Sequence, residues 1–244
     1  MKGIILAGGL GTRLHPFTQH DNKHLLPVYD KRMVEFPLRT LIDAGIDDII
    51  LITGGHRPGK FLEIFKNGKS IGANRLYYTY QEGEGGIADA LKMGRPFMRS
   101  NESCVVILGD NYFEDGIRRQ YKSWDRKGAQ VFLKEVDALH SPYYGIAETE
   151  GSKIVGIEEK PPIPKTNLAI VGCYLFDHTL WDKLENVKPS SRNELEITDV
   201  LKFYMEEDKL GYSSYEGYWK DMGTFHTWME ASKRVHSQWE KETK

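Results

Sequence analysis

Continuous runs of apolar residues recur along the first half of the chain, and each run ends close to glycine. Apolar residues that follow one another without alternation are typical of strands buried on both faces of a parallel sheet. The expected strands are residues 2–7, 48–53, 76–80 and 104–108.

Between these runs the apolar positions follow helical spacing. Val34, Leu38 and Leu41 fall on one face of a helix expected over 33–44, which Gly45 would end. Further helices are expected near 61–65 and over 86–93. Alternating strands and helices predict an α/β fold: a Rossmann-like, doubly wound, mixed and mostly parallel sheet with helices on both faces.

The second half has shorter connections between its apolar runs. We expect it to share the same sheet and to add a small subdomain, so that 1–244 forms a single domain. Helix 195–205 is expected to open around 191–194, and the last helix covers 224–239. The expected strands of this half are 131–134, 145–149, 154–159 and 169–176.

Composition excludes several classes of function. The net charge of −2 gives no global field for nucleic acid or an anionic membrane, and no apolar run approaches the ~20 residues of a membrane span. The first apolar run stops at Ala7, unlike a signal peptide, and Cys104 and Cys173 lie in apolar runs as small buried residues. We therefore expect a cytoplasmic protein. The eight histidines show no ligand spacing and are expected at the surface or at caps.

A glycine-rich turn follows the first strand. It reads Gly8-Gly9-Leu10-Gly11-Thr12-Arg13, and Lys23 comes ten residues after the arginine. Such a turn can bring backbone N–H groups and two cations to a chain of phosphates, which indicates a nucleoside triphosphate site. No Gly-Lys-Ser/Thr completes a Walker loop, and Leu14 stands where a dinucleotide fingerprint needs glycine. An NAD site and a purely structural turn remain as weaker alternatives.

Charged residues elsewhere leave two interpretations open. Asp110 after the fourth strand and Asp221 before the last helix are each either a helix cap or a metal ligand, and together they could hold Mg²⁺. Lys23 is either a snorkelling surface residue or a phosphate ligand. Glu158-Glu159-Lys160 is a solvated turn or part of a site, and Arg192 lies near a helix start that would favour an anion.

These residues resemble a known family. The stretch Ile4…Leu6-Ala7-Gly8-Gly9-Leu10-Gly11-Thr12-Arg13-Leu14…Lys23…Leu25-Leu26-Pro27-Val28 is similar to the signature of the sugar nucleotidyltransferases. It looks most like a short form of the glucose-1-phosphate thymidylyltransferases, or dTDP-glucose pyrophosphorylases. Further matches are Gly109-Asp110-Asn111, Tyr144-Gly145, Glu158-Glu159-Lys160-Pro161, Glu194-Leu195-Glu196-Ile197-Thr198-Asp199 and Asp221-Met222-Gly223-Thr224.

The resemblance implies nucleotidyl transfer from dTTP to glucose 1-phosphate, giving dTDP-glucose and pyrophosphate with Mg²⁺ as cofactor. It implies a nucleotide-binding half over about 1–128, a sugar-binding half over about 129–244, and a homo-oligomer, dimer or tetramer. By resemblance Arg13, Lys23 and Lys160 are catalytic, and Asp110 and Asp221 hold the metal. The implied nucleotide-binding residues are Leu6, Gly8, Gly9, Gly11, Thr12, Arg13, Gln81, Gly86 and Ile87, and the implied sugar-phosphate-binding residues are Tyr144, Gly145, Glu159, Lys160, Ile170 and Arg192.

One departure concerns the helix after the expected base-binding loop, where Asp89 stands in place of a frequent glutamine. Two alternatives to the implied reaction stay open. One is a sibling enzyme that uses UTP, CTP or another hexose 1-phosphate, and the other is a non-catalytic nucleotide-sugar sensor. Intact Arg13, Lys23, Asp110 and Asp221 favour an enzyme, because a sensor need not keep the pyrophosphate and metal groups.

Overall fold

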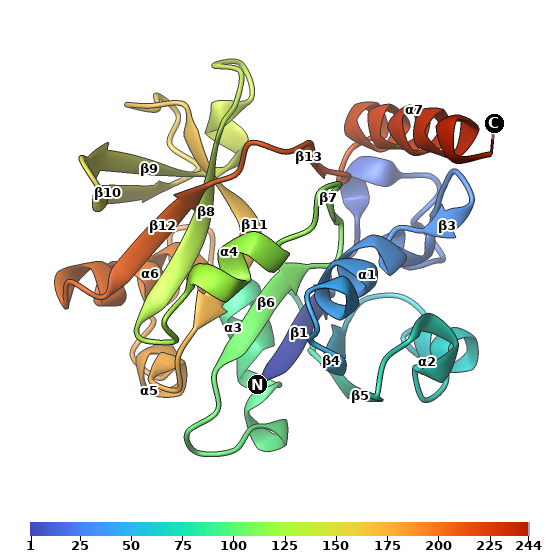
Figure 1. Ribbon diagram of the computed structural model, residues 1–244, viewed down its shortest axis with the longest axis horizontal. Coiled ribbons are helices and arrows are strands. Elements are labelled where there is room, and N and C mark those ends of the chain that lie inside the picture. Colours follow the sequence, from blue (N-terminus) through green and yellow to red (C-terminus); the bar gives the residue numbers. More distant parts are fainter. Residues whose placement is uncertain (244) are drawn as a thin grey trace.

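A nine-stranded mixed sheet runs through both halves of the chain in the computed structural model, which describes residues 1–243 (Figure 1). Four strands at its centre and one edge are parallel, in the order β6-β1-β4-β5. Their bounds are β1 Lys2–Ala7, β4 Asp48–Thr53, β5 Arg75–Tyr80 and β6 Cys104–Leu108. They agree with the strands expected from the sequence to within one residue.

The long strand β11, Leu168–Phe176, joins the second half of the chain to this parallel sheet. It pairs antiparallel with β6, β8 and β9, and β12 then lies parallel to β8. The other strands of this half are β8 Ala129–Glu135, β9 Gly145–Glu150, β10 Lys153–Glu159 and β12 Leu210–Ser214. The predicted mixed α/β fold class is confirmed.

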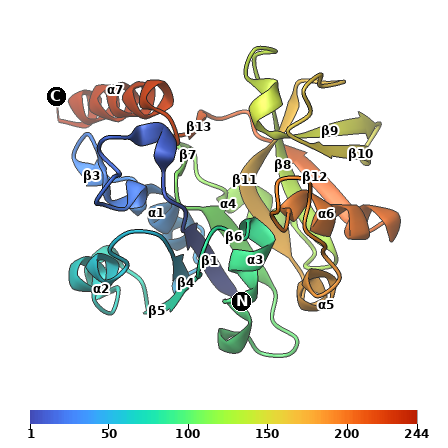
Figure 2. The same cartoon turned by 180° about the vertical axis from the view of Figure 1, so that it is seen from behind.

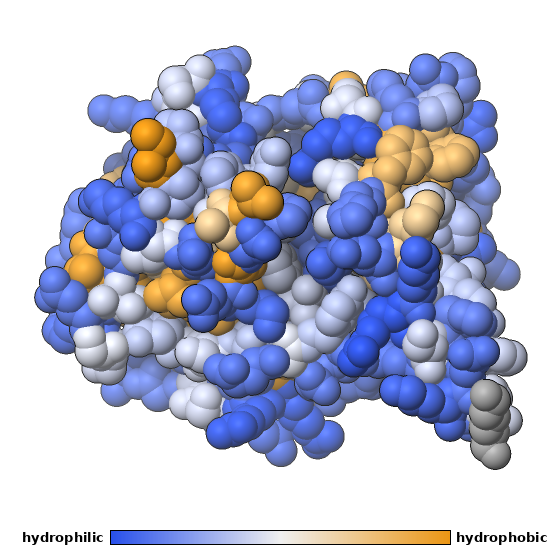
Figure 3. All heavy atoms as spheres, turned by 90° about the horizontal axis from the view of Figure 1, so that it is seen from above, coloured by the Kyte–Doolittle hydropathy of each residue, from blue (hydrophilic) through white to orange (hydrophobic). Residues whose placement is uncertain are grey.

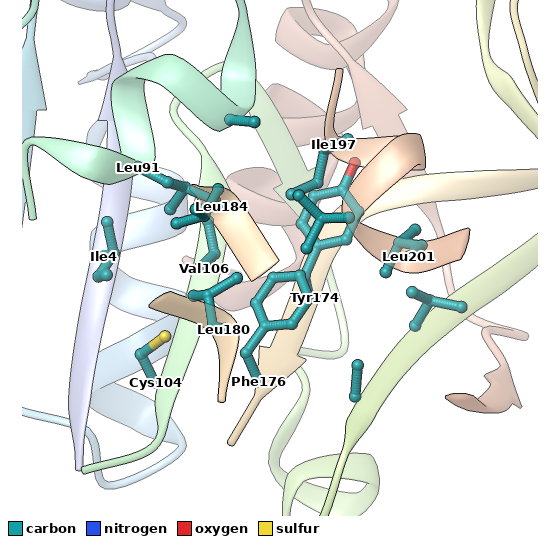
Figure 4. Packing of buried hydrophobic residues seen from close by; sticks show 14 of the residues in the cluster. Ile4, Leu91, Cys104, Val106, Tyr174, Phe176, Leu180, Leu184, Ile197 and Leu201 are labelled. Carbon is teal, nitrogen blue, oxygen red and sulfur yellow. The ribbon is translucent and has the colours of Figure 1, made fainter. Parts of the chain in front are cut away.

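Helices cover both faces of the sheet, as Figures 1 and 2 show from opposite sides. Alternate residues of β1 enter separate cores: Ile4 packs towards α3, α5 and α6, whereas Ile5 packs towards α1 and α2. Figure 4 shows the first core, where Ile4 and Val106 of the sheet lie near Leu91 of α3 and Leu184 of α5. The helices are α1 Glu35–Asp43, α2 Gly59–Phe65, α3 Ile87–Lys92, α4 Arg118–Ser123, α5 Leu180–Leu184 and α6 Ile197–Glu206.

The last helix, α7 (Phe225–Glu242), returns to the N-terminal half and lies above its first loops (Figure 1). Leu14, Met33, Met222 and Val235 form a third buried cluster beneath it. Two short antiparallel pairs support this region. They are β2 Pro27–Val28 with β3 Lys31–Arg32, and β7 Asn111–Phe113 with β13 Trp219–Asp221.

Two predicted helix starts lie two residues too early: α1 begins at Glu35 and not at 33, and α6 begins at Ile197 and not at 195. The helix expected from residue 195, opening around 191–194, begins at Ile197 because Glu196 is extended, with ψ 139°. The side chain of Glu196 instead accepts hydrogen bonds from Ser190 and Arg192. The sequence analysis also missed α4, α5, β2, β3, β7, β12 and β13, all of them segments of six residues or fewer that carry little periodicity.

Both cysteines are free and buried, as expected. Within residues 1–243 no helix has the length and apolar character needed to cross a membrane. The face seen in Figure 3 is mostly hydrophilic, with apolar side chains in small separate areas. The largest exposed fractions among apolar side chains are those of Ile163 and Leu139, at 85% and 80%.

Candidate functional site

A cleft of about 560 Å³ lies across the carboxyl ends of the parallel strands, where ligands bind in open α/β sheets. All the candidate residues of the sequence analysis line it, although their roles remain predictions. From the first half these are Leu6, Gly8, Gly9, Gly11, Thr12, Arg13, Lys23, Gln81, Gly86, Ile87 and Asp110, and from the second half Tyr144, Gly145, Glu159, Lys160, Ile170, Arg192 and Asp221.

The glycine turn closes tightly after β1. Gly9 and Gly11 have φ values of 88° and 65°, a region that glycine adopts without strain. A Cβ atom at Gly11 would come within 3.0 Å of the Lys23 side chain, and the Thr18 hydroxyl donates to the Gly11 carbonyl at 2.7 Å. The turn therefore packs against the loop that carries Lys23, and a short 3₁₀ turn, Thr12–Leu14, follows it.

Lys23 forms an ion pair with Asp110 across the cleft wall. The Lys23 side chain is only 14% exposed, so the snorkelling interpretation is wrong. Asn111 donates to the other Asp110 oxygen at 3.0 Å. Burial alone would raise the pKa of Asp110, but the Lys23 charge and these hydrogen bonds hold it well below its usual range. Asp110 is therefore a carboxylate in the free protein.

Asp221 reaches the same place from the other half of the chain. The register of β13 on β7 sets Asp221 opposite Asn111, and Gly223 N–H donates to Asp221 Oδ1 at 2.7 Å. The helix-cap interpretation of Asp221 is wrong, because Thr224 caps α7 through a capping box. A Cβ atom at Gly223 would lie 2.8 Å from Asp221 Oδ1 and 2.9 Å from Arg13 Nη2. Arg13 and Asp221 thus converge on either side of Gly223.

The negative charges of Asp110 and Asp221 repel each other, and a divalent cation bound between them would relieve this repulsion. Burial and the neighbouring Asp110 charge raise the pKa of Asp221. Within residues 1–243 there is no group of three or more His, Cys, Asp or Glu side chains that could hold a metal by itself. Mg²⁺ is commonly held by one or two carboxylates together with substrate phosphates and water. Asp110 and Asp221 offer that partial donor set.

His24 is a site residue that the sequence analysis missed. Its ring is buried, so the expectation of a surface or capping role is wrong here. Asn22 Oδ1 contacts His24 Nδ1 at 2.8 Å and accepts from its backbone N–H at 3.0 Å. Burial and the Lys23 charge lower the pKa of His24 to about 3, so the ring is neutral and packs beneath Gly109. No spacing in the sequence could have indicated this contact.

The opposite wall of the cleft comes from β9 and β10, whose register sets Glu159 opposite Gly145. Arg192 Nη2 lies 2.7 Å from Glu196 and 3.3 Å from Glu159, and Lys160 Nζ lies 3.5 Å from Glu159. Burial raises the pKa of Glu159 more than the nearby cations lower it. The Glu159 side chain is 20% exposed, so it belongs to the cleft and not to a solvated turn.

A third loop adds an amide group to the cleft. The buried Gln81 side chain donates from Nε2 to the Gly86 carbonyl at 3.1 Å and to Asp89 Oδ2 at 2.7 Å. Gly86 has φ 93°, and a Cβ atom there would lie 2.6 Å from the Leu195 carbonyl. The loop is therefore pressed against the segment before α6, with Ile87 and Leu6 lining the same space.

Known proteins resemble this chain over nearly its whole length. The model of the nucleotidyl transferase family matches residues 2–238. The chain is 40% identical to a glucose-1-phosphate thymidylyltransferase from Xanthomonas campestris pv. campestris, covering 97% of this chain and 81% of the relative. It is 38% identical to an enzyme of the same name from Mycolicibacterium smegmatis, covering 97% and 83%.

Solved structures show the same fold. A crystal structure from Bacillus anthracis, provisionally described as a glucose-1-phosphate thymidylyltransferase in complex with sucrose, superposes with a TM-score of 0.89. It is 39% identical and covers 96% of this chain and 94% of its own. A UDP-glucose pyrophosphorylase complexed with UDP-glucose has a TM-score of 0.85, covering 97% and 98%. At 23% identity that second likeness concerns the fold alone.

Proposed function

This chain belongs to the nucleotidyl transferase family, and from that membership we propose that it transfers a thymidylyl group from dTTP to glucose 1-phosphate. The products are dTDP-glucose and pyrophosphate. The observation that carries the proposal is the meeting of Arg13 and Lys23 with Asp110 and Asp221 beside the glycine turn. Cations for a leaving pyrophosphate and carboxylates for a metal are the two charge types that this reaction needs.

The reaction is a displacement at phosphorus. A phosphate oxygen of glucose 1-phosphate forms a bond to the α-phosphorus of dTTP, while the bond from that phosphorus to the oxygen bridging to the β-phosphate breaks. The electron pair leaves with pyrophosphate, which Arg13 and Lys23 bind. No covalent intermediate with the protein is required, so positioning and charge neutralisation supply most of the rate enhancement.

Asp110 and Asp221 would hold Mg²⁺, the predicted cofactor. Bound there, the cation would neutralise charge on the reacting phosphates. The ion pair of Lys23 with Asp110 has a role in the free protein, because it keeps the carboxylate ionised. The raised pKa of Asp221 is consistent with a site that gains from an added positive charge.

The second half of the cleft would receive glucose 1-phosphate. Lys160 and Arg192 would bind its phosphate, since both place cationic nitrogens on this wall. Glu159 and the backbone at Gly145 would bind hydroxyl groups of the hexose, with Tyr144 and Ile170 beside them. The sugar phosphate would exchange places with carboxylates that now pair with Arg192.

The loop of Gln81 and Gly86 would bind the base edge, and Leu6 and Ile87 would pack near its face. A buried amide is a strong specificity device, because a mismatched base leaves it unpaired. Base recognition then lies at the Gln81 loop, away from the residues that bind the departing pyrophosphate.

A pyrophosphate-release assay tests the proposal. Four triphosphates (dTTP, UTP, CTP and ATP) are crossed with the 1-phosphates of glucose, galactose and mannose, with and without Mg²⁺. We expect the fastest release with dTTP, glucose 1-phosphate and Mg²⁺, and background release from the Asp110→Asn/Asp221→Asn double variant. A different preferred pair would identify a sibling enzyme instead. Absence of pyrophosphate release in every condition would contradict nucleotidyl transfer and favour the nucleotide-sugar sensor.

A further inference from the structure

We propose that Asp89 is a positioning residue that fixes the amide of Gln81 so that its carbonyl oxygen faces the base, which selects thymine or uracil over cytosine. The inference rests on the proposed function, because it concerns the triphosphate of that reaction. Asp89 lies in the first turn of α3 and is not among the residues that the resemblance assigned to the site.

The orientation of the amide follows from its two partners. Gln81 Nε2 lies 2.7 Å from Asp89 Oδ2 and 3.1 Å from the Gly86 carbonyl oxygen. A carboxylate and a carbonyl can only accept hydrogen bonds, so the NH₂ end of the amide must face both. The flipped orientation would set Oε1 against two oxygens. The assignment of nitrogen and oxygen is therefore fixed by chemistry and not by the shape of the side chain.

The carbonyl oxygen of the Gln81 amide, Oε1, is available to a ligand in the cleft. Oε1 accepts no hydrogen bond from residues 1–243, and a Cβ atom at Gly8 would lie 3.2 Å from it. Gly8 belongs to the glycine turn, and both residues line the cleft. Gln81 thus offers the nucleotide an acceptor, while both of its donor hydrogens point away into the protein.

An acceptor discriminates among pyrimidines at ring position N3. Thymine and uracil carry a proton on N3 and can donate to Oε1, whereas N3 of cytosine is itself an acceptor. Two facing acceptors leave both groups unpaired, the situation in which a buried polar site rejects a ligand most strongly. The same contact cannot separate thymine from uracil, since both carry the N3 proton.

The position of the Asp89 carboxylate is itself fixed by packing, as it must be to orient the Gln81 amide. A Cβ atom at Gly85 would lie 2.5 Å from Asp89 Oδ2, so the carboxylate packs directly on the loop. That loop is tied to the segment before α6 by the hydrogen bond from Leu195 N to Gly85 O at 2.8 Å. Within the described chain Asp89 makes no ion pair, so no charged side chain competes with Gln81 for its oxygens.

The test compares kcat/KM for dTTP, dUTP and dCTP with saturating glucose 1-phosphate and Mg²⁺. Asp89→Ala removes the acceptor and keeps a good helix former, and Asp89→Asn keeps one acceptor oxygen. Glu82→Gln is the matched control, because it removes a carboxylate from the exposed neighbour of Gln81 without touching the amide. Melting temperatures are measured for all variants. If the Asp89→Ala protein fails to fold, Asp89→Leu also lacks an acceptor and takes its place.

We expect Asp89→Ala to lower the dTTP to dCTP ratio of kcat/KM about tenfold, the effect of one buried hydrogen bond. The dTTP to dUTP ratio should not change, and Asp89→Asn and Glu82→Gln should keep the parent ratio to within about threefold. In a Gln81→Met background, Asp89→Ala should have no further effect on the ratio, because Asp89 acts only through the amide.

An unchanged dTTP to dCTP ratio in Asp89→Ala would overturn the inference, whether activity is kept or is lost equally for all three triphosphates, as a merely structural role would give. Failure of the proposed function looks different, because the wild-type protein itself would then show no turnover. Calorimetric titration of dTTP and dCTP against the wild-type and Asp89→Ala proteins would still test the orientation of Gln81 in that case.

Discussion

Lys23 and Asp110 are 87 positions apart in the sequence and form one buried ion pair in the fold. Each partner alone had an ordinary interpretation, a surface lysine and a helix-capping acid. The ion pair rules out both of these interpretations, because a buried charge is retained only with a partner. Beside them, burial and the Asp110 charge raise the pKa of Asp221, and a bound divalent cation would offset both effects.

Asp110→Asn tests the metal site with little change in shape. We expect turnover to fall at least about a hundredfold, because the carboxylate that would bind Mg²⁺ is lost. The measurement is kcat at saturating dTTP and glucose 1-phosphate, with the melting temperature as a check on folding. Asp43→Asn, an exposed acid at the end of α1, is the matched control for charge. Near-normal turnover in Asp110→Asn would remove Asp110 from the metal site.

Arg13→Ala tests the binding of pyrophosphate. Arg13 lies beside Gly223 and Asp221 and lines the cleft at the glycine turn. We expect the rate to fall about a hundredfold to a thousandfold, both for synthesis and for pyrophosphorolysis of dTDP-glucose, since both directions share one transition state. Initial rates in each direction are the measurement. A variant with a raised KM for glucose 1-phosphate and an unchanged kcat would contradict this role.

At the scale of elements, the loop before α3 illustrates how a turn can be set by a distant segment. Gly86 has φ 93°, and the space for a side chain there is filled by the backbone at Leu195. The N–H of Ala88 donates to that same carbonyl at 3.0 Å. The start of α3 and the segment before α6 are therefore hydrogen-bonded to each other, and the position of the Gln81 amide depends on this contact.

Gly86→Ala should destabilise the protein by about 1–3 kcal/mol, because it adds backbone strain and a clash. It should also weaken dTTP binding, since the loop must move away from the segment before α6. Gly83→Ala is the matched control: Gly83 also has a positive φ, 70°, but nothing lies within 4 Å of an added Cβ. Urea unfolding measures the stability of both variants. An equal loss of stability in the two variants would show that the contact with Leu195 is unimportant.

The start of β1 is tied to the segment before β6 by Lys2 and Glu102, with Nζ to Oε2 at 2.7 Å. Burial alone would raise the pKa of Glu102, but the hydrogen bond from Lys2, the terminal ammonium group and the Arg99 N–H lower it to about 2. A carboxyl group whose pKa is lowered on folding stabilises the fold above its unfolded pKa. That stability is lost as the pH falls from about 4.5 towards 2.

Glu102→Gln should therefore cost on the order of 1–2 kcal/mol of unfolding free energy at pH 7, after allowance for solvent screening. The difference from the parent protein should shrink as the pH falls from about 4.5 towards 2. Urea unfolding at several pH values measures this. A difference that stays constant over that range would show that Glu102 acts through packing and not through its charge.

At the scale of the whole molecule, β11 joins the two halves and closes the cleft between them. Its pairing with β6 carries the second half to the parallel strands, and β13 on β7 then brings Asp221 to Asp110. The boundary expected near residue 128 and the expected homo-oligomer stay predictions. The cleft draws its lining from both halves, so a ligand that fills it should stabilise both together.

We expect dTTP with Mg²⁺, at about 100 times its Kd, to raise the unfolding free energy by about 2.7 kcal/mol. In a chain of this size that corresponds to a rise of about 5–10 °C in melting temperature. Differential scanning calorimetry with Mg²⁺ and with EDTA measures the effect. A single transition that moves as a whole is expected. Two transitions, of which only one shifts, would show that the halves unfold independently.

The sequence by itself determined the fold class and many of the residues that line the cleft. Unbroken apolar runs ending in glycine require buried strands followed by tight turns, and the ends of parallel strands meet at one edge of a sheet. The motif from Gly8 to Lys23, with Asp110 and Asp221, therefore predicted residues that line a single cleft, while their roles stay predictions.

Tertiary structure alone decided how these residues meet. The neutral, buried His24, the contact of Gly86 with Leu195, and the orientation of Gln81 by Asp89 all depend on packing between separate segments. The local sequence does not predict such contacts, because each of these side chains in isolation is compatible with a surface position. The register of strands and the space between loops select one arrangement, and that arrangement sets the charge and hydrogen-bonding state of the site.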